Sequence, residues 1–244
     1  MKTIDLKKTW ISLLILPLVM ISCNEDYLPG ITGYGDVVSQ NLSLDEFTGF
    51  GNSIAADIFI SQGEEQEVII EAQQNIIDNI ELDRVENGFW TIRNDRWVRK
   101  AEPVKIYITI PNLDKVVISG SGYVTGETSF TDLDDLDLVI SGSGSIILDL
   151  ESESLDITIS GSGDLDLTGE TRAIDVTISG SGNVRAFDLE SENVECLISG
   201  SGDARLSVSE YLKAVISGSG NVIYRGTPAM EVRISGSGGV KQDQ

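Results

Sequence analysis

The sequence predicts an all-β protein, a parallel β-helix-like solenoid with repeated Ser-Gly-Ser-Gly corners. Three observations predict this fold: the tetrapeptide occurs seven times, the copies are spaced 18 to 22 residues apart, and an isoleucine directly precedes every copy. A repeat of this length cannot bury its apolar face alone, and it gains a core by stacking on its neighbours. The copies begin at Ser119, Ser141, Ser160, Ser179, Ser199, Ser217 and Ser235.

The residues before each corner alternate as in a strand with one buried face. The position three residues before the first serine is apolar or small, as at Val176 and Ala214, and the position four residues before it is charged, as at Asp175 and Lys213. Apolar and polar residues that alternate with period two are typical of a β-strand whose one face packs on a core. We therefore expect a buried column of isoleucines, each contributing about 1.5–3 kcal/mol.

The tetrapeptide is predicted to be a corner between two strands, because the alternation resumes directly after it, as in Asp164-Leu165. Glycine suits such a corner because it accepts positive φ and has no Cβ to collide with the coil above. Adjacent coils lie about 4.8 Å apart, so like residues form columns. We expect the corner serine hydroxyls to hydrogen-bond along their columns, as stacked polar side chains do in cross-β assemblies.

Residues 47–118 lack the tetrapeptide, and we interpret them as irregular first coils and an N-terminal β cap, whereas residues 119–240 carry the repeats. Asn87-Gly88 lies between two β-like runs and is a strong hairpin-turn signal. Pro111-Asn112-Leu113 is predicted to be a turn and not a linker, so we expect one domain over residues 47–240. The predicted strands of this part are Asn52–Ile60, Glu67–Ala72, Ile80–Val85, Phe89–Arg93 and Val104–Ile110.

Residues 1–22 are predicted to be a secretory signal peptide of the lipoprotein type, because three lysines precede the apolar run Trp10–Ile21. Met20-Ile21-Ser22-Cys23 resembles a bacterial lipoprotein processing site, in which Cys23 becomes the lipidated amino terminus. Residues 23–46 are then a tether, and the membrane is a partner through the lipid anchor. An uncleaved anchor and ordinary secretory cleavage are the alternatives. Asn24-Glu25-Asp26 resembles the acidic sorting signals that direct some lipoproteins to the cell surface, so we expect an outer-membrane or cell-surface location.

The run Val104–Leu113 leading into Val116–Ser119, together with the lipoprotein signal and the phased Gly-Ser-Gly corners, resembles the head GIN domain family. The resemblance extends from about Phe47 to Val240. It implies a fold similar to pectin-lyase-like β-helices and a role as an autotransporter adhesin. The family has no agreed catalytic residues, so the resemblance assigns none to this chain.

Composition excludes several classes of function. The chain of 244 residues has a formal net charge of −22 and no histidine. Nucleic-acid partners are excluded because phosphate contacts need clusters of Lys and Arg. A Ser-His-Asp or Cys-His nucleophile cannot exist without histidine. Of the two cysteines, Cys23 is assigned to lipidation and Cys196 lies in an inward-facing column, so we predict no disulfide framework, metal site or cofactor.

Two sets of residues are candidate ligand sites. The first set follows the corner in four consecutive coils and forms one column of oxygen ligands that could share Ca²⁺; the alternative is that these residues form turns. The second set mixes aromatic residues with arginines that could stack on sugars or receive an acidic partner; the alternative is a hairpin that caps the core. The first set is Asp164, Asn183, Asp203 and Asn221, and the second is Trp90, Arg93, Trp97 and Arg99.

We therefore expect a non-enzymatic envelope or cell-surface adhesin, whose rigid solenoid binds a glycan or another envelope component. A polysaccharide-acting β-helix enzyme and a purely structural envelope protein are the alternatives; the first rests on fold analogy. The repeats continue to Gly238, so the last coil exposes backbone that could support self-association. Lys241, Gln242 and Asp243 could instead blunt that end.

Overall fold

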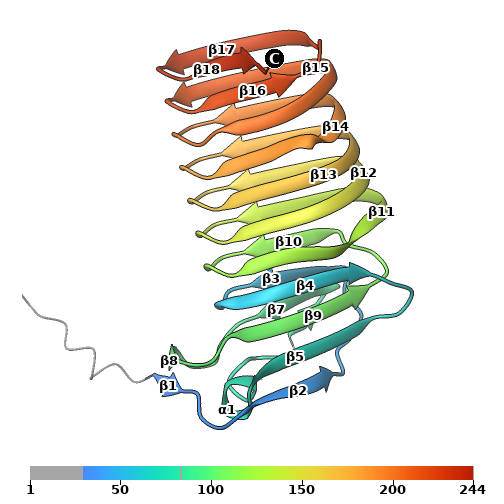
Figure 1. The fold of residues 1–244 in the computed structure, drawn as a ribbon, viewed down its shortest axis with the longest axis vertical. Coiled ribbons are helices and arrows are strands. Elements are labelled where there is room, and N and C mark those ends of the chain that lie inside the picture. The colour runs from blue at the N-terminus through green and yellow to red at the C-terminus, as the bar shows by residue number, and fades with distance from the viewer. Residues whose placement is uncertain (1–29, 83, 244) are drawn as a thin grey trace, which may run out of the picture.

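The computed structural model describes residues 30–82 and 84–243. It is an elongated stack of coils, with the first strands at one end and the C-terminus at the other (Figure 1). The chain forms a β-solenoid of about seven turns, which confirms the predicted fold class. The predicted signal peptide and Cys23 lie outside the described residues.

One chain segment makes a whole coil of the regular part, because each long strand bends in its middle. β12 runs along one face from Ser145 to Leu150, turns at residues 151–154, and returns along the other face to Ile159. The coils pair in parallel and in register, so that Ile159 lies beside Ile178 of β13. The strands of this part are β10 (Lys115–Ile118), β11 (Tyr123–Ile140), β12 (Ser145–Ile159), β13 (Asp164–Ile178), β14 (Asn183–Ile198), β15 (Ala204–Gly218), β16 (Asn221–Arg225), β17 (Ala229–Gly236) and β18 (Gly239–Gln242).

Columns of identical or similar apolar side chains fill the space between the two faces. The isoleucines before the corners, from Ile118 to Ile216, are at most 1% exposed, whereas Ile234 of the last coil is 45% exposed. Cys196 lies in the adjacent column, between Val176 and Ala214, and is buried as expected. Burial raises the pKa of its thiol to about 12, so it is an apolar core residue and not a nucleophile.

Crowding, and not positive φ, explains the first glycine of most corners. A Cβ on Gly180 would lie against the carbonyl oxygen of Gly161, closer than real Cβ atoms approach any atom, yet the φ angle of Gly180 is not positive. Backbone bonds join the corners, as from the Ser181 amide to the Gly161 carbonyl oxygen at 3.0 Å. In the described part of the chain, no hydrogen bond to a corner serine hydroxyl is found, so the expected serine ladder is wrong. The outward-facing hydroxyls leave the backbone to hold the coils.

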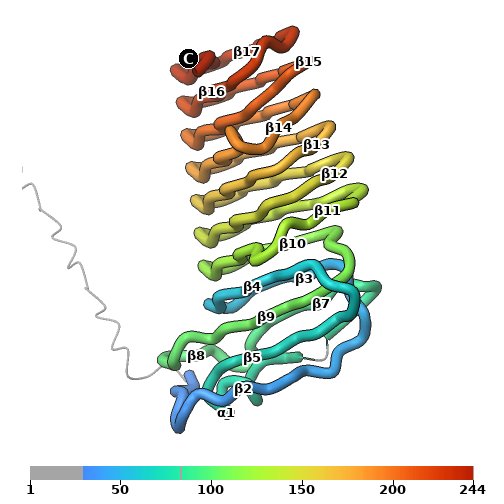
Figure 2. Tube along the Cα trace, turned by 45° about the vertical axis from the view of Figure 1, so that its right-hand side comes forward, coloured from blue at the N-terminus to red at the C-terminus, as the bar shows by residue number. Residues whose placement is uncertain are grey.

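The first coils do not follow the order of the sequence. β3 pairs in parallel with β10 on one side and β7 on the other, and β4 pairs in the same way with β11 and β9. The coil made by β3 and β4 is therefore held between two coils that come later in the chain (Figures 1 and 2). These strands are β3 (Gly49–Asn52), β4 (Ala56–Gln62), β7 (Phe89–Ile92) and β9 (Val104–Ile110).

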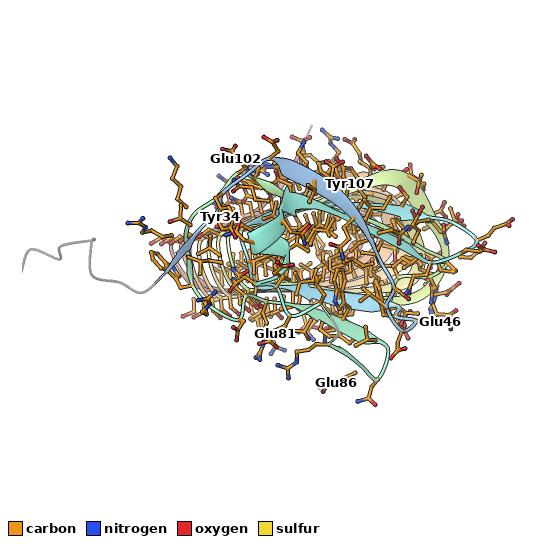
Figure 3. The ribbon with its side chains drawn as sticks, turned by 90° about the horizontal axis from the view of Figure 1, so that it is seen from below. Tyr34, Glu46, Glu81, Glu86, Glu102 and Tyr107 are labelled. Carbon is orange, nitrogen blue, oxygen red and sulfur yellow. The ribbon has the colours of Figure 1, made fainter. Side chains whose placement is uncertain are left out.

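Antiparallel strands and a short helix close the N-terminal end. β5 pairs antiparallel with β9, and β2 pairs antiparallel with β5. Figure 3 looks onto this end, where α1 lies over the interior and Glu46, Glu86 and Glu102 lie around the rim. The elements are β1 (Ile31–Thr32), β2 (Val37–Leu42), β5 (Glu67–Gln73), α1 (Gln74–Ile77), β6 (Val85–Glu86) and β8 (Val98–Lys100).

The structure confirms one expected detail of the cap and corrects another. Asn87 and Gly88 form the turn between antiparallel β6 and β7, with φ of 53° and 75°. The strand expected over Ile80–Val85 is wrong, because among the described residues of that range only Val85 lies in a strand, and Ile80 forms an isolated bridge. The short helix α1 before it buries Ile76 and Ile77, and Ile80 is buried at its bridge.

Candidate functional site

The predicted patch of aromatic residues and arginines is not one surface. Trp90 on β7 is fully buried, its ring centroid lies 5.4 Å from that of Phe47, and its indole N–H donates to the carbonyl oxygen of Leu82 at 3.0 Å. The hypothesis that Trp90 binds a ligand at the surface is therefore wrong. Its physical role is that of a cap: a large aromatic side chain fills the end of the core and satisfies its one donor internally.

The other three patch residues lie at the edge of the cap. Arg93 makes a bidentate ion pair with Glu81, with both N···O distances 2.8 Å. These hydrogen bonds lower the pKa of the Glu81 carboxyl. Arg99 donates to the Thr32 hydroxyl at 3.2 Å, and Trp97 is 54% exposed. The guanidinium of Arg93 is thus engaged in an ion pair within the protein. Ligand binding by Trp97 and Arg99 stays a prediction.

The four residues that follow the corners do form one column, held by hydrogen bonds. Asp164 Oδ1 accepts from the backbone amide of Asn183 at 3.1 Å and from its Nδ2 at 2.8 Å. Asp203 and Asn221 repeat the pattern, with both distances 2.9 Å, and Asn183 Oδ1 accepts from the Asp203 amide at 3.2 Å. Acid and amide alternate along the column, so no two carboxylates are stacked in it.

This alternation supports a structural role for the column. Each Oδ1 of the first three residues is an acceptor for the next coil, which leaves fewer oxygens for a cation. Among the residues that the structure describes, no group of three or more His, Cys, Asp or Glu is positioned to hold a metal ion. Calcium binding to the column stays a prediction.

A concave groove follows the corner opposite the Ser-Gly-Ser-Gly edge, and we call it the distal groove. It has a volume of about 820 Å³ and crosses the bends of six successive coils. Its lining comes from the same few positions in each coil, because the coils stack in register. The lining residues are Asp132, Leu133, Asp134, Glu151, Ser152, Glu153, Glu170, Thr171, Arg172, Glu190, Ser191, Glu192, Ser207, Val208, Ser209, Gly226 and Thr227.

The floor of the distal groove is a column of small hydroxyl side chains. Ser152, Thr171 and Ser191 occupy equivalent positions, and Thr171 and Ser191 are 3% and 5% exposed. The Ser152 hydroxyl donates to Thr171 Oγ1 at 2.9 Å, and the Ser209 hydroxyl donates to the Ser191 carbonyl oxygen at 3.1 Å. These bonds fix the hydroxyls, so the floor is an ordered polar surface.

The two walls of the distal groove differ in charge. One wall is a column of three stacked glutamates, Glu151, Glu170 and Glu190. On the other wall Arg172 lies between two acids, and its Nε donates to Glu153 at 2.8 Å. The hydrogen bond that Arg172 donates to Glu153, and then the charges of Glu153 and Glu192, raise the pKa of Arg172. The groove therefore offers exposed carboxylate acceptors and one guanidinium along a floor of hydroxyl side chains, of which Thr171 and Ser191 are buried.

The sequence does carry a signal for the distal groove. Glu-Ser-Glu at residues 151–153, Glu-Thr-Arg at 170–172 and Glu-Ser-Glu at 190–192 repeat in phase with the corners. From the sequence, the residues beside the corners were considered, and no site was predicted at this weaker repeat. Gly169 supports the bend beside it, since its φ is +114° and a Cβ there would strike the Leu150 carbonyl oxygen.

A separate column of acids on the outer face lacks the alternation seen beside the corners. Asp156, Asp175 and Glu195 stack directly on one another, and Lys115 and Lys213 flank the run of acids from Asp137 to Glu195. Burial, then the charges of Asp156 and Glu195, raise the pKa of Asp175. Burial also opposes ionisation of Asp164, but hydrogen bonds from Asn183 and Arg185 outweigh it and lower that pKa.

We therefore predict opposite effects of one substitution at two positions. An acid with a raised pKa costs stability when ionised, so Asp175→Asn raises the free energy of unfolding at neutral pH by a few tenths of a kcal/mol. An acid with a lowered pKa contributes stability above its unfolded pKa, so Asp164→Asn lowers the free energy of unfolding at neutral pH. Both differences shrink in acid as the wild-type carboxyls are protonated. Thermal unfolding of both variants from pH 7 downward tests this, and changes of the same sign would contradict it.

The fold and the groove define a class of protein: a rigid β-solenoid that displays an open, polar surface groove. The family model described as "Putative auto-transporter adhesin, head GIN domain" matches residues 46–228. The chain belongs to the head GIN domain family, which confirms the resemblance seen in the sequence. No curated protein matches the chain at a significant level.

Solved structures with the same fold come from Bacteroides and Parabacteroides species. A "putative adhesin" from Bacteroides fragilis has a TM-score of 0.81 and 25% identity, and the match covers 88% of this chain and 100% of that one. A "putative lipid binding protein" from Parabacteroides distasonis (TM-score 0.74, 21% identity) and a "putative adhesin" from Parabacteroides merdae (0.72, 22%) are each matched over 88% of this chain and 99% of theirs. Over residues 30–82 and 84–243, no helix is long and apolar enough to cross a membrane.

Proposed function

We propose that the protein is an exported, lipid-anchored adhesin that binds a glycan in the distal groove without cleaving it. One observation carries this proposal: the same set of an acid, a hydroxyl residue and a second charged residue recurs in register in three consecutive coils. A linear polymer that lies along the groove meets equivalent groups in each coil. Membership of an adhesin family supports the proposal.

The groups in the groove suit neutral sugars. Carboxylates accept hydrogen bonds from hydroxyls, and charge-assisted bonds of this kind are the stronger ones. The stacked Glu151, Glu170 and Glu190 disfavour acidic sugars and other polyanions, because like charges repel at close range. We therefore expect hydroxyl-rich, uncharged or amino-substituted glycans as ligands.

The repetition also favours binding over catalysis. Carboxylates that share general acid and general base roles need environments that push their pKa values apart. The glutamate column instead places the same side chain in the same position of successive coils. A glycan-cleaving enzyme is the alternative that the experiment must be able to detect.

The ends of the solenoid fit an anchor at the N-terminal side. β1, which begins at Ile31, lies at the capped end (Figure 1), and Cys23 precedes Ile31 by eight residues in the sequence. With Cys23 lipidated, the capped end faces the membrane and the groove extends away from it along the stack. This arrangement supports the expected outer-membrane or cell-surface location.

A glycan-array screen tests this function. The chain from Asn24 onward is displayed multivalently, and each glycan that binds is then incubated with the protein and analysed for cleavage. We expect binding of neutral glycans and no cleavage. The double substitution Glu170→Gln with Glu190→Gln should weaken binding by about tenfold or more, since each lost hydrogen bond to a charged group is worth about 1.5–3 kcal/mol.

The matched control removes two stacked carboxylates outside the groove, from the β12 and β13 coils, by Asp156→Asn with Asp175→Asn. It should bind as the unchanged protein does. Equal loss in both double variants would reject the distal groove as the site and point to overall charge. Cleavage of a bound glycan would reject the non-enzymatic role, and a complete absence of glycan binding would favour a protein partner or a structural role.

A further inference from the structure

The last coil leaves one row of core side chains uncovered. β17 pairs with β15 on one edge, and no strand of the described residues pairs with its other edge. Met230, Val232 and Ile234 are 42%, 41% and 45% exposed, whereas their counterparts one coil earlier are at most 1% exposed. β18 pairs only with β16 on the opposite face, so the polar tail does not cover this row. The expectation that residues 241–243 blunt the end therefore does not hold for the face that carries β17.

An open parallel edge with an apolar row is a template for another strand. The sequence of this edge, Met-Glu-Val-Arg-Ile over residues 230–234, reads as its own complement about Val232. In an antiparallel pair of two copies centred there, Glu231 lies opposite Arg233 of the second copy on the outer face. Met230 lies opposite Ile234 on the inner face, and Val232 faces itself. Opposite charges and apolar pairs directly across strands both stabilise a sheet.

The charge of the last coil also fits a second copy. Residues 225–243 hold three basic and two acidic side chains, in a chain whose net charge is −22. Contact between these two ends therefore avoids the repulsion that the acidic sides of the solenoid would produce. In the single chain Arg233 pairs with its own neighbour Glu231 at 2.8 Å, so both groups are already placed on the outer face.

The opposite end of the solenoid offers no equivalent surface. There β2, β5 and α1 cover the core, and the exposed β2 edge carries Val37 and Val38 on alternate faces and not in one row. A two-fold contact between C-terminal ends closes after two copies, whereas a head-to-tail contact would continue into a filament. The self-complementary edge selects the closed arrangement.

From these observations we infer that β17 is a homophilic adhesion surface, through which two copies join end to end by antiparallel pairing centred on Val232. The two capped ends then lie at opposite extremes of the dimer, because each solenoid carries β17 at the end away from its cap (Figure 1). Copies anchored near their capped ends would join two facing membranes. The joining of two membranes rests on the proposed lipid anchor at Cys23. The pairing of two β17 strands does not depend on that anchor.

Charge exchange tests the pairing. Sedimentation velocity of the chain from Asn24 onward is expected to show a concentration-dependent dimer. Glu231→Arg alone and Arg233→Glu alone each place like charges opposite one another, so each variant should be monomeric. An equimolar mixture of the two variants should restore the dimer, because the arginines of one variant then face the glutamates of the other. Arg205→Glu, a charge reversal inside the stack and away from the β17 edge, should leave the dimer intact.

Two outcomes would overturn the pairing: a monomeric unchanged protein at all concentrations, or single variants that dimerise as the unchanged protein does. Circular dichroism and thermal unfolding of each variant identify any that fails to fold, and the mixture remains decisive because both chains must then be native. Vesicles that carry the chain coupled through an added N-terminal cysteine test the membrane step. They should cluster with the unchanged protein, and variant vesicles should cluster only when the two kinds are mixed.

Failure of this inference and failure of the proposed function give different results. A dimer that does not cluster vesicles would reject the joining of membranes while keeping the pairing. Loss of glycan binding in the groove variants would leave both dimer and clustering unchanged, because the groove and β17 share no residue.

Discussion

Replacement of Gly180 with alanine is expected to lower the free energy of unfolding by about 3 kcal/mol. The added Cβ would strike the carbonyl oxygen of Gly161 in the coil below, and backbone cannot move aside as a flexible side chain can. Overpacking of a tight interior usually costs about 1–3 kcal/mol, and a backbone obstacle favours the upper end. Equilibrium unfolding in urea, followed by circular dichroism, measures the change.

Gly239→Ala is the matched control for this prediction. Gly239 also follows a corner, but its nearest neighbour to a new Cβ would be Asn221 Oδ1 at 3.7 Å. Alanine there should be neutral or slightly stabilising, because it reduces the freedom of the unfolded chain. If Gly180→Ala were as stable as Gly239→Ala, the prediction would be contradicted, because the stacked corners could then move apart to accept the added Cβ.

Replacement of Ile178 with alanine is expected to lower the free energy of unfolding by about 2–5 kcal/mol. The side chain is fully buried between Ile159 and Ile198, so alanine leaves a cavity with a coil on each side. Ile234→Ala removes the same atoms from the same column at its open end, where the side chain is 45% exposed. The free energy of unfolding should fall in Ile234→Ala by well under half as much as in Ile178→Ala.

The comparison must be made at concentrations where the protein is monomeric, because Ile234 belongs to the proposed β17 contact. Denaturant unfolding at several dilutions separates the two effects. Equal losses at Ile178 and Ile234 in monomeric samples would contradict the buried column as a main source of stability.

The regular coils could be predicted from the sequence because each one reproduces the same physical demand. An isoleucine before every corner and alternation on both sides of it fix which side chains face inward, and successive coils then have only one register. The buried position of Cys196 followed from this column without any knowledge of its neighbours. The local sequence pattern was sufficient to predict the fold wherever consecutive repeats in the sequence form adjacent coils in the structure.

The first coils could not be predicted in the same way, because their neighbours in space are distant in sequence. Nothing in residues 49–62 indicates that later segments cover both of its edges. Asn52 also occupies the isoleucine column, where its side chain accepts from the Ile54 amide at 3.1 Å and so forms its own corner. A polar residue at that position conceals the coil from any search for the repeat.

The candidate site was only partly accessible for a related reason. Alignment of the repeats correctly predicted that the residues directly after the corners form one column. The distal groove, in contrast, depends on how sharply each coil bends opposite the corners, and the repeat pattern does not give that angle. Trp90 was misjudged because alternation shows that one face of β7 is buried without showing which flanking element covers it. The covering residues, Phe47 and Leu82, come from segments with no regular pattern.

The position of the β3–β4 coil has a consequence for the order in which the chain folds. β3 and β4 come early in the sequence, yet their coil lacks both neighbours until residues 89–126 are also available. The entropy of closing such long loops is lost before the strand contacts that compensate for it can form. This step is therefore expected to be slow. Each later coil needs only the one before it. We therefore expect the cap and the first repeat to fold as one unit, and the remaining coils to add to it in the order of the sequence.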